Sequence, residues 1–194
     1  MIKKAITAVF IATTVMASFS VMAADVGLLT FDGAVTDSTC KLTTSNGEDA
    51  YNVTITLPVV KKSEVESTSI DTGVGSKNFE LLLTDCPESV VNASTTFMSN
   101  NMAAIANGTI EPDANMSGAA SNVALALYNN TATSTDRIMI GQPASNTQKV
   151  ALENGSGQLQ YRVAYVPGSN WVATTNPVIA GKVTANAYFT LNYE

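Results

Sequence analysis

The chain has 194 residues, of which 45% are hydrophobic and 13% are charged, and its formal net charge is −6. These values are typical of a folded domain with an apolar core, and they argue against nucleic acid as a partner, because nucleic acid selects basic surfaces. The chain contains no histidine, which removes the usual general base, the usual partner of a nucleophilic serine or cysteine, and a common metal ligand. We therefore expect no enzymatic activity, no catalytic residue, no metal site and no cofactor.

The first 23 residues are typical of a secretory signal peptide. Lys3 and Lys4 precede an apolar run over 5–15, and a stretch of small residues ends at Ala23 and Ala24. Cleavage after Ala23 leaves 171 residues, and a retained membrane anchor is the alternative interpretation. The leader holds two of the ten basic residues and none of the sixteen acidic ones, so the remaining chain carries a net charge of −8.

Two cysteines, Cys40 and Cys86, are the only ones in the chain. Exported proteins enter an oxidising compartment, where a disulfide is the default state of a cysteine pair. Such a bond would restrict the unfolded chain by about 4 kcal/mol in the loop-entropy account. Two unrelated buried thiols are the alternative.

Short runs of alternating polarity dominate the chain after residue 25, and clusters of Gly, Asn, Pro, Ser and Thr separate them. This pattern predicts an all-β sandwich without a long helix. Seven strands are about what an immunoglobulin-like sandwich needs. The segment 61–66, which mixes charges, is predicted to be a solvated loop. The expected strands are 28–35, 53–57, 79–84, 95–98, 123–128, 159–166 and 183–191.

The last fourteen residues form the most complete of these patterns. Apolar or small residues occupy every second position, which is the period of a strand with one buried face. An uncovered apolar strand edge promotes aggregation, so something must cover this strand. The alternating residues are Val183, Ala185, Ala187, Phe189 and Leu191, and Tyr193 is the penultimate residue.

A second alternating set follows the predicted signal peptide. Alternation alone does not say which sheet a strand joins, so an ordinary first strand of the same domain is one interpretation. Its members, all on one face if the segment is extended, are Gly27, Leu29, Phe31, Gly33 and Val35.

With these features the chain resembles the structural subunits of chaperone-usher pili, the type 1 fimbrial major-subunit family of Gram-negative bacteria. The resemblance covers almost the whole chain. Its most specific element is the C-terminal pattern, with Gly181 fourteen residues from the end and the penultimate Tyr193. Further motifs are Phe31-x-Gly33-x-Val35 before Cys40, Leu57-Pro58-x-Val60, the alternating run 79–86 into Cys86, and the runs 123–128 and 159–165.

The resemblance implies an immunoglobulin-like sandwich that lacks its last strand and exposes a hydrophobic groove along its C-terminal strand. A strand from a periplasmic chaperone fills the groove first, and the N-terminal extension of the next subunit replaces it in the fibre. The implied divisions are a signal peptide 1–23, a donor-strand extension 24–38 and an incomplete pilin domain 39–194. The implied donor residues are Gly27, Leu29, Phe31, Gly33 and Val35. The implied groove and chaperone-binding residues are Gly181, Val183, Ala185, Ala187, Phe189, Leu191 and Tyr193.

The expected function is therefore a self-polymerising subunit of a surface fimbria that supports cell adhesion. The expected partners are further copies of the chain, a periplasmic chaperone, an outer-membrane usher, and a tip adhesin or adaptor, after export through the periplasm. The alternatives are a minor adaptor subunit of the same system, a secreted sandwich that completes its own sheet and acts as a binding module, and a carboxylate-dependent hydrolase. The Asn-rich region 92–122 does not fit the family pattern.

Overall fold

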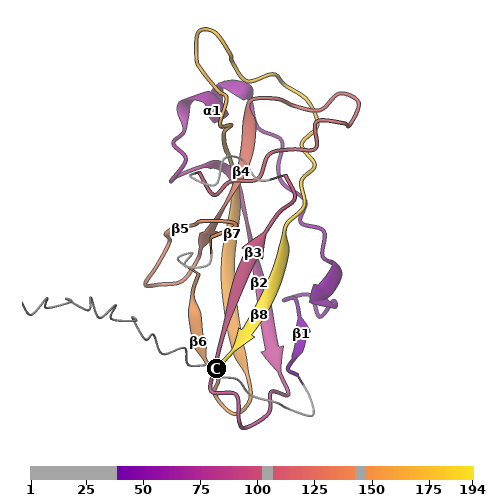
Figure 1. Cartoon of the computed structure of the whole chain (residues 1–194), viewed down its shortest axis with the longest axis vertical. Helices are drawn as coiled ribbons and strands as arrows, with labels where there is room; N and C mark the ends of the chain where they lie inside the picture. Colours follow the sequence, from indigo (N-terminus) through magenta and orange to yellow (C-terminus); the bar gives the residue numbers. More distant parts are fainter. Residues whose placement is uncertain (1–38, 102–106, 143–146) are drawn as a thin grey trace, which may run out of the picture. The chain divides into compact units, whose positions relative to one another are not determined.

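The protein is described by a computed structural model that covers residues 39–101, 107–142 and 147–194 (Figure 1). The predicted signal peptide and the predicted donor strand lie outside these residues. No helix within the described ranges is both long enough and apolar enough to cross a membrane.

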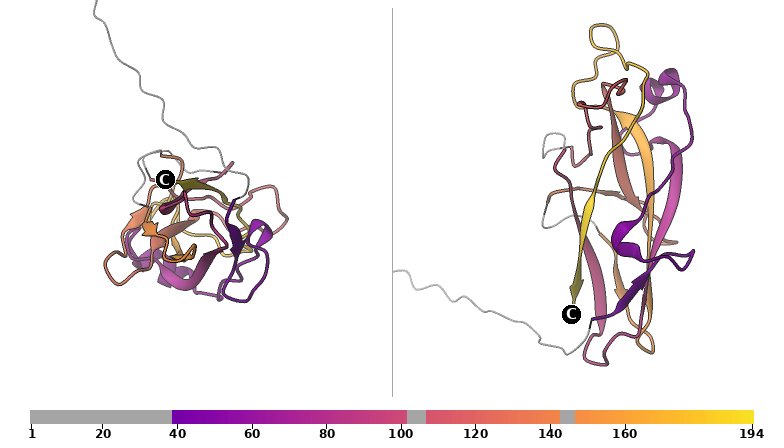
Figure 2. Two further views of the ribbon diagram at one scale, coloured as in Figure 1. Left: turned by 90° about the horizontal axis from the view of Figure 1, so that it is seen from below. Right: turned by 90° about the vertical axis from the view of Figure 1, so that its right-hand side faces the viewer.

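The described residues form two antiparallel sheets that pack face to face (Figures 1 and 2). The larger sheet contains, in spatial order, β1 (Lys41–Thr43), β2 (Val74–Thr84), β7 (Gly157–Pro167), β4 (Val123–Asn129) and β5 (Arg137–Ile138). The smaller sheet contains β6 (Lys149–Ala151), β3 (Asn92–Met98) and β8 (Tyr188–Tyr193). The predicted all-β, immunoglobulin-like sandwich is confirmed.

The main core lies between the two sheets. Leu81, Leu127 and Tyr161 come from the larger sheet, and Ala93 and Phe97 come from the smaller one. In β3 and β7 buried residues alternate with half-buried ones, as expected for strands with one face on a core. The alternating sequence pattern therefore places the sandwich interior correctly.

β4 differs because all seven of its residues are buried. One face contacts the main core, and the other face packs, with Ile70, in a second cluster on the outside of the sheet. The small side chains of Ala124 and Ala126 allow the segment around Ile70 to approach the strand closely. A strand covered on both faces has a continuous apolar sequence, as this one does.

The segment predicted as a solvated loop instead contains a short helix, α1 (Lys62–Ser67). The Glu64 carboxylate accepts a hydrogen bond of 2.6 Å from the Lys61 backbone N–H, which caps the first turn. Val65, on the inner side of the helix, is buried in a small cluster with Val178 and Ala120. One 3₁₀ turn, η1 (Ala50–Asn52), is also present.

The strand predicted at 183–191 is shorter than expected, because its ladder begins only at Tyr188. The preceding residues bond instead to the long connection between β3 and β4. Asp113 donates its backbone N–H to the Thr184 carbonyl at 2.9 Å, and Ser121 and Ile179 exchange two backbone hydrogen bonds. The loops of region 92–122, which the family pattern left without a place, thus follow β3 and support the approach to β8.

Among the other predicted strands, 79–84, 95–98, 123–128 and 159–166 lie within β2, β3, β4 and β7. The prediction of a strand at 53–57 is wrong as stated, because this segment forms no ladder with a described residue. The predicted disulfide is confirmed: Cys40 and Cys86 are bonded, with 4.1 Å between their Cα atoms. The disulfide lies next to the hydrogen-bonded pairing of β1 with β2 and links the two strands covalently.

Candidate functional site

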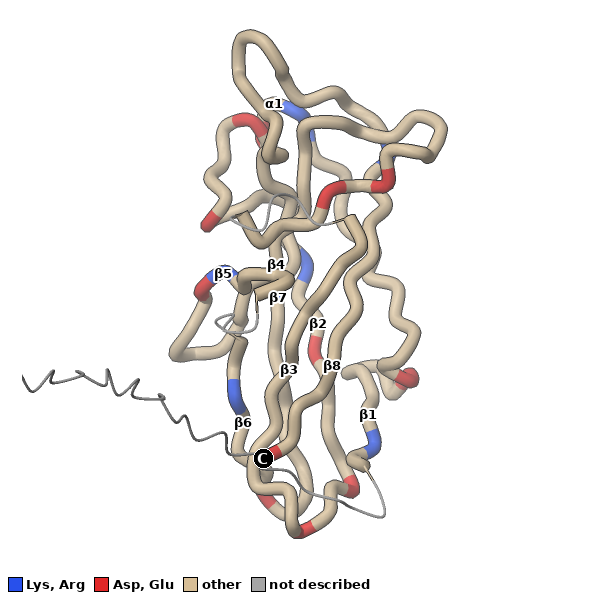
Figure 3. The backbone as a smooth tube through the Cα atoms, viewed as in Figure 1, with Lys and Arg blue, Asp and Glu red and all other residues tan. Residues whose placement is uncertain are grey.

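A groove of about 650 Å³ lies between β8 and the segment 53–57. In the ribbon views, β8 and the segment after η1 both run along the sandwich (Figures 1 and 2). Neither 53–57 nor 183–193 contains a charged residue, as the uncharged course of β8 in Figure 3 illustrates. The apolar floor consists of core side chains: Leu81, Phe97, Ile110, Leu125, Leu127 and Val163. Three charged residues, Glu48, Lys77 and Glu80, also line the cavity.

Along the β8 wall, half-buried side chains alternate with exposed ones. Phe189, Leu191 and Tyr193 are the half-buried members and pack against the main core. The Phe189 ring lies 6.5 Å from the ring of Phe97, centroid to centroid. β8 therefore turns one apolar face to the floor of the groove.

The hydrogen-bond register of β8 shows which backbone groups face the groove. Asn92 and Glu194 exchange two backbone hydrogen bonds, and antiparallel pairing then assigns the even-numbered residues of β8 to β3. The N–H and C=O groups of the odd-numbered residues, such as Phe189 and Leu191, point to the opposite edge. No described strand pairs with that edge.

The other wall has matching properties. Ile55 and Leu57 are half-buried against the core, whereas Thr54 and Thr56 between them are exposed. Val53 has the extended values φ −105° and ψ 134°. No backbone hydrogen bond joins 53–57 to another described residue. The segment thus begins with an extended residue, turns alternate side chains to the core, and lacks a described ladder partner.

A second, smaller cavity of about 290 Å³ continues along β8 to its end, where Thr39, Tyr51 and Tyr193 contribute to its lining. Burial raises the pKa of Tyr193, the nearby Tyr51 raises it further, and a hydrogen bond with the Cys40 backbone lowers it. The end of β8 therefore lies beside the disulfide and beside the first described residue, Thr39.

The residues predicted to line a groove occupy three kinds of position. Ala185, Ala187 and Phe189 line the larger cavity, and Leu191 and Tyr193 line the smaller one. The other two predicted members, Gly181 and Val183, line neither cavity. The predicted donor residues Gly27, Leu29, Phe31, Gly33 and Val35 lie outside the described residues, so their role stays a prediction.

Val183 is half-buried between two apolar clusters. At Gly181, an added Cβ would lie 2.5 Å from both the Ala120 nitrogen and the Gly118 oxygen. Both atoms belong to the backbone of the β3–β4 connection, so no flexible side chain can move aside. Gly181 is required here for close packing of two backbones.

The sequence did not reveal the opposite wall of the groove. Ile55 and Leu57 were predicted to lie in an ordinary strand. Of the floor residues, five were predicted only as members of strands, and Ile110 was not singled out. The signal that was available is the alternation in 53–57, which resembles that of 183–193. Alternation does not show whether a strand has two neighbours or one.

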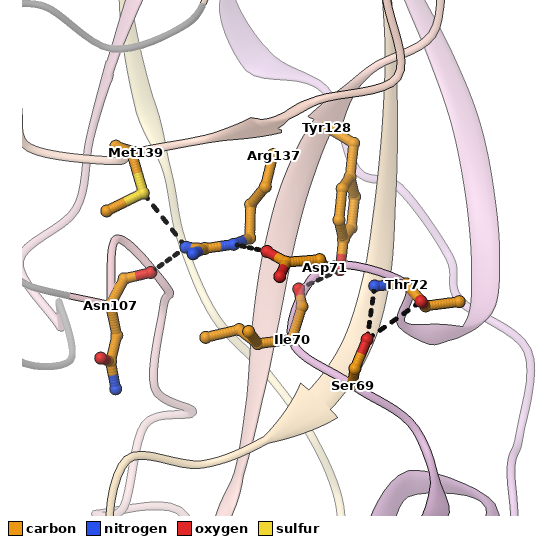
Figure 4. A network of polar contacts seen from close by, with 8 residues as sticks. All are labelled: Ser69, Ile70, Asp71, Thr72, Asn107, Tyr128, Arg137 and Met139. Carbon is orange, nitrogen blue, oxygen red and sulfur yellow. Dashed lines mark hydrogen bonds and ion pairs between the residues drawn. The ribbon is translucent and has the colours of Figure 1, made fainter.

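A cluster of polar contacts lies on the outside of the larger sheet (Figure 4). The Arg137 guanidinium donates to the Asp71 carboxylate at 2.9 Å and also contacts the Asn107 carbonyl and the Met139 sulfur. Tyr128 donates its hydroxyl to the Ile70 carbonyl at 2.7 Å. These contacts fasten the loop that leads into β2.

Burial also raises the pKa of Tyr128 to about 12, although the charges of Arg162 and Arg137 act in the opposite direction. The Arg162 guanidinium lies 3.9 Å from the centre of the Tyr128 ring. No group of three or more described acidic, Cys or His side chains is placed to hold a metal ion. The cluster therefore has a structural role, which is to hold the loop before β2 against the larger sheet.

Comparisons with known proteins agree with this description. A sequence profile of the family described as fimbrial protein matches residues 29–194. The chain is 30% identical to the laminin-binding fimbrial subunit ElfA of Escherichia coli O157:H7, over 98% of this chain and 99% of the relative. It is also 30% identical to the F17 fimbrial protein of Escherichia coli, over 92% and 93% of the two chains.

A third relative is the major fimbrial subunit SMF-1 of Stenotrophomonas maltophilia, which is 30% identical over 86% of this chain and 92% of its own length. Among solved structures, the CupB6 tip adhesin of Pseudomonas aeruginosa aligns with a TM-score of 0.47 and 15% identity, over 62% of this chain and 31% of that chain. That structural likeness is too weak to carry weight. From the profile match and the sequence relatives together, the chain is a fimbrial subunit and belongs to the fimbrial protein family.

Proposed function

We propose that this fimbrial subunit polymerises by donor-strand exchange, in which residues 24–38 of one copy fill the groove between β8 and 53–57 of another. One observation carries the proposal. Two extended segments face each other across an apolar floor, and neither has a described ladder partner on the facing edge. A strand inserted between them would bond to both edges and cover the floor.

The inserted segment has side chains suited to that floor. Burial of Leu29 and of Phe31 would each contribute about 1.5–3 kcal/mol, and ladder hydrogen bonds would add to this. Ordering the segment costs about 1–2 kcal/mol for each residue fixed. The two large side chains therefore matter most for whether insertion is favourable.

The ends of the described domain favour a linear assembly. Thr39 and Tyr193 line the same small cavity, so the described part of the chain begins at the end of the domain where β8 finishes. A donor strand antiparallel to β8 would enter from that end of the acceptor and leave at the opposite end, where its own domain follows. Such a head-to-tail contact is heterologous and does not close on itself, so it produces a filament.

The same groove would require protection before assembly. An exposed apolar strand edge is an aggregation hazard, and a chaperone that lends a strand removes it. We infer that a periplasmic chaperone occupies the groove after export and that an outer-membrane usher exchanges it for the next subunit. The fimbria then stands at the cell surface, where such fibres support adhesion.

The test is a donor variant with Leu29→Asp and Phe31→Asp. Charged side chains cannot be buried in the apolar groove without a large cost, so this variant should bind the chaperone normally but fail to add to a fibre. Thr30→Asp is the matched control, because residue 30 would lie on the exposed face of the inserted strand and fibres should form normally. Fibres of normal length from the double variant would refute the proposal.

A further inference from the structure

The groove differs along its length in how much room it offers beside β8. The larger cavity lies beside Ala185, Ala187 and Phe189, and the smaller one lies beside Phe189, Leu191 and Tyr193. Phe189 places a ring beside the groove, 6.5 Å from the Phe97 ring of the floor, whereas Ala185 and Ala187 each contribute only a methyl group. Space for large side chains is therefore greatest beside the two alanines.

The backbone register restricts how an inserted strand can lie. Odd-numbered residues of β8 turn their backbone groups to the open edge and their side chains to the floor. The same alternation continues before β8, because the carbonyls of the even-numbered Thr184 and Asn186 accept from the Asp113 backbone N–H and the Ser99 hydroxyl, on the side away from the groove. Residues directly opposite each other in an antiparallel pair place their side chains on the same face. The apolar donor residues must therefore face the odd-numbered residues of 183–193, and the permitted registers differ by steps of two residues.

The donor segment has a size pattern that complements the groove. Leu29 and Phe31 are large, and they are flanked by Gly27 and Gly33, which have no side chain. The acceptor strand has the reverse pattern, because its two adjacent small residues, at 185 and 187, are flanked by larger side chains at 183 and 189. Well-packed interfaces place large residues opposite small ones.

We propose, as a consequence that rests on donor-strand exchange, that one register is selected by this complementarity of size. In it every large donor residue meets a small acceptor residue, and each donor glycine meets a large one. The opposed pairs are Gly27 with Phe189, Leu29 with Ala187, Phe31 with Ala185, and Gly33 with Val183.

Each neighbouring register has a defect. If the donor strand shifts by two residues toward the end of β8, Leu29 lies opposite Phe189. Gly33 then lies opposite Ala185, and no large side chain fills the space between them. A shift of four opposes Phe31 to Phe189. Voids and overpacking in apolar interiors each cost a few kcal/mol, typically about 1–3 kcal/mol for overpacking. Both shifts should therefore be strongly disfavoured.

A shift in the other direction is no better. If the donor strand shifts by two residues away from the end of β8, Phe31 lies opposite Val183, whose side chain is already packed between two apolar clusters. Gly27 then lies opposite Ala187. The first contact is crowded and the second is empty. The proposed register is the one in which neither defect occurs along the groove.

Cysteine cross-linking in assembled fibres measures the register. A Leu29→Cys subunit is assembled with a subunit carrying Ala187→Cys, and the comparison subunits carry Phe189→Cys or Leu191→Cys. Disulfides form when Cα atoms are about 4.4–6.8 Å apart, as in directly opposed residues, whereas diagonal neighbours are about 7–8 Å apart. Under mild oxidation, the pair of residues 29 and 187 should give at least about tenfold more cross-linked dimer than either comparison pair, as expected from this distance dependence.

Stronger cross-linking to residue 189 or 191 would overturn the register while leaving donor-strand exchange intact. A size exchange provides an independent readout that does not need cysteines. Ala187→Leu in the acceptor should block insertion of the wild-type donor, and Leu29→Ala in the donor should restore fibres. Normal assembly of Ala187→Leu with the wild-type donor would also overturn the register, whereas normal fibres from the Asp variant of residues 29 and 31 would overturn the exchange itself.

Discussion

At the scale of single residues, Tyr161 is the most informative side chain of the core. It is fully buried, its hydroxyl lies 2.5 Å from that of Thr95, and its ring meets Phe97 edge-on at 5.1 Å. The contact joins β7 of the larger sheet to β3 of the smaller one. A polar pair at this position fixes the alignment of the two sheets, because each hydroxyl satisfies the other.

We predict that Tyr161→Phe lowers the free energy of unfolding by about 1–3 kcal/mol, because Thr95 keeps a buried hydroxyl without its partner. Urea unfolding of the purified subunit measures the change. The double variant with Thr95→Val is the control, since removal of both hydroxyls leaves no unsatisfied group and should recover most of the loss. A double variant less stable than Tyr161→Phe would contradict this account.

The same tyrosine predicts a pH dependence. Burial raises the pKa of Tyr161 to about 12, against about 10 in the unfolded chain. The folded state therefore holds this proton more tightly, so its stabilising contribution is complete below pH 10 and is lost as the pH rises to 12. The difference between the folded and unfolded pKa values corresponds to about 2–3 kcal/mol of unfolding free energy. Tyr161→Phe should remove this part of the fall in unfolding free energy when unfolding is measured at increasing alkaline pH. If the unfolding free energy of the variant fell with pH as steeply as that of the wild type, Tyr161 would not be the cause of the decline.

Gly181 gives a second prediction at this scale. Gly181→Ala should weaken the packing of the β3–β4 connection against the approach to β8, because the added Cβ would meet backbone atoms at 2.5 Å. The expected results are a lower thermal midpoint and a smaller yield of chaperone-bound subunit. Ala180→Ser, at the exposed neighbouring position, is the control and should behave like the wild type. A wild-type midpoint for Gly181→Ala would show that the connection can move without cost.

At the scale of elements, the loop before β2 depends on the polar cluster of Figure 4. The Asp71 side chain is 75% exposed, whereas that of Arg137 is 16% exposed and contacts three groups. We predict that Asp71→Asn changes stability by less than about 1 kcal/mol, as is usual for an exposed ion pair. Arg137→Ala should cost more, since it leaves the Asn107 carbonyl without this donor; equal effects in thermal unfolding would contradict this assignment.

The long strands could be predicted from the sequence because their alternation extends over many residues. β7 was recognised in this way, and so was the C-terminal strand, whereas β4 is marked by a continuous apolar run between turn residues. β1, β5 and β6 were missed because two or three residues are too few to show a period. Val65 alone distinguishes α1 from a solvated loop, and one buried residue gives no helical pattern.

The groove could be predicted only in part. Ala185, Ala187 and Phe189 were expected on one apolar face, and they do line the larger cavity. Ile55 and Leu57 were not expected on the opposite wall, because sequence periodicity shows that a strand has a buried face but not which neighbour it lacks. The departure of 183–187 from the ladder depends on hydrogen bonds to residues about 70 positions earlier, which no local pattern contains.

At the scale of the whole molecule, the disulfide is the main covalent constraint. It links residues 46 positions apart, at the start of β1 and the end of β2. Cys40→Ser with Cys86→Ser should therefore destabilise the subunit by about 4 kcal/mol in the loop-entropy account. Denaturant unfolding of oxidised and reduced subunit measures this value, and a difference below about 1 kcal/mol would show that the bond adds little to the folded state.

The central claim is that the groove of one copy is completed by the segment 24–38 of another. The most direct measurement is refolding of the mature chain, residues 24–194, with and without an excess of a synthetic peptide of residues 24–38. Gel filtration and amide exchange along β8 then report size and protection. We predict multimers without the peptide and a one-to-one complex with it, in which the amides of Phe189 and Leu191 become protected. A soluble monomer that forms without the peptide and does not bind it would contradict the claim.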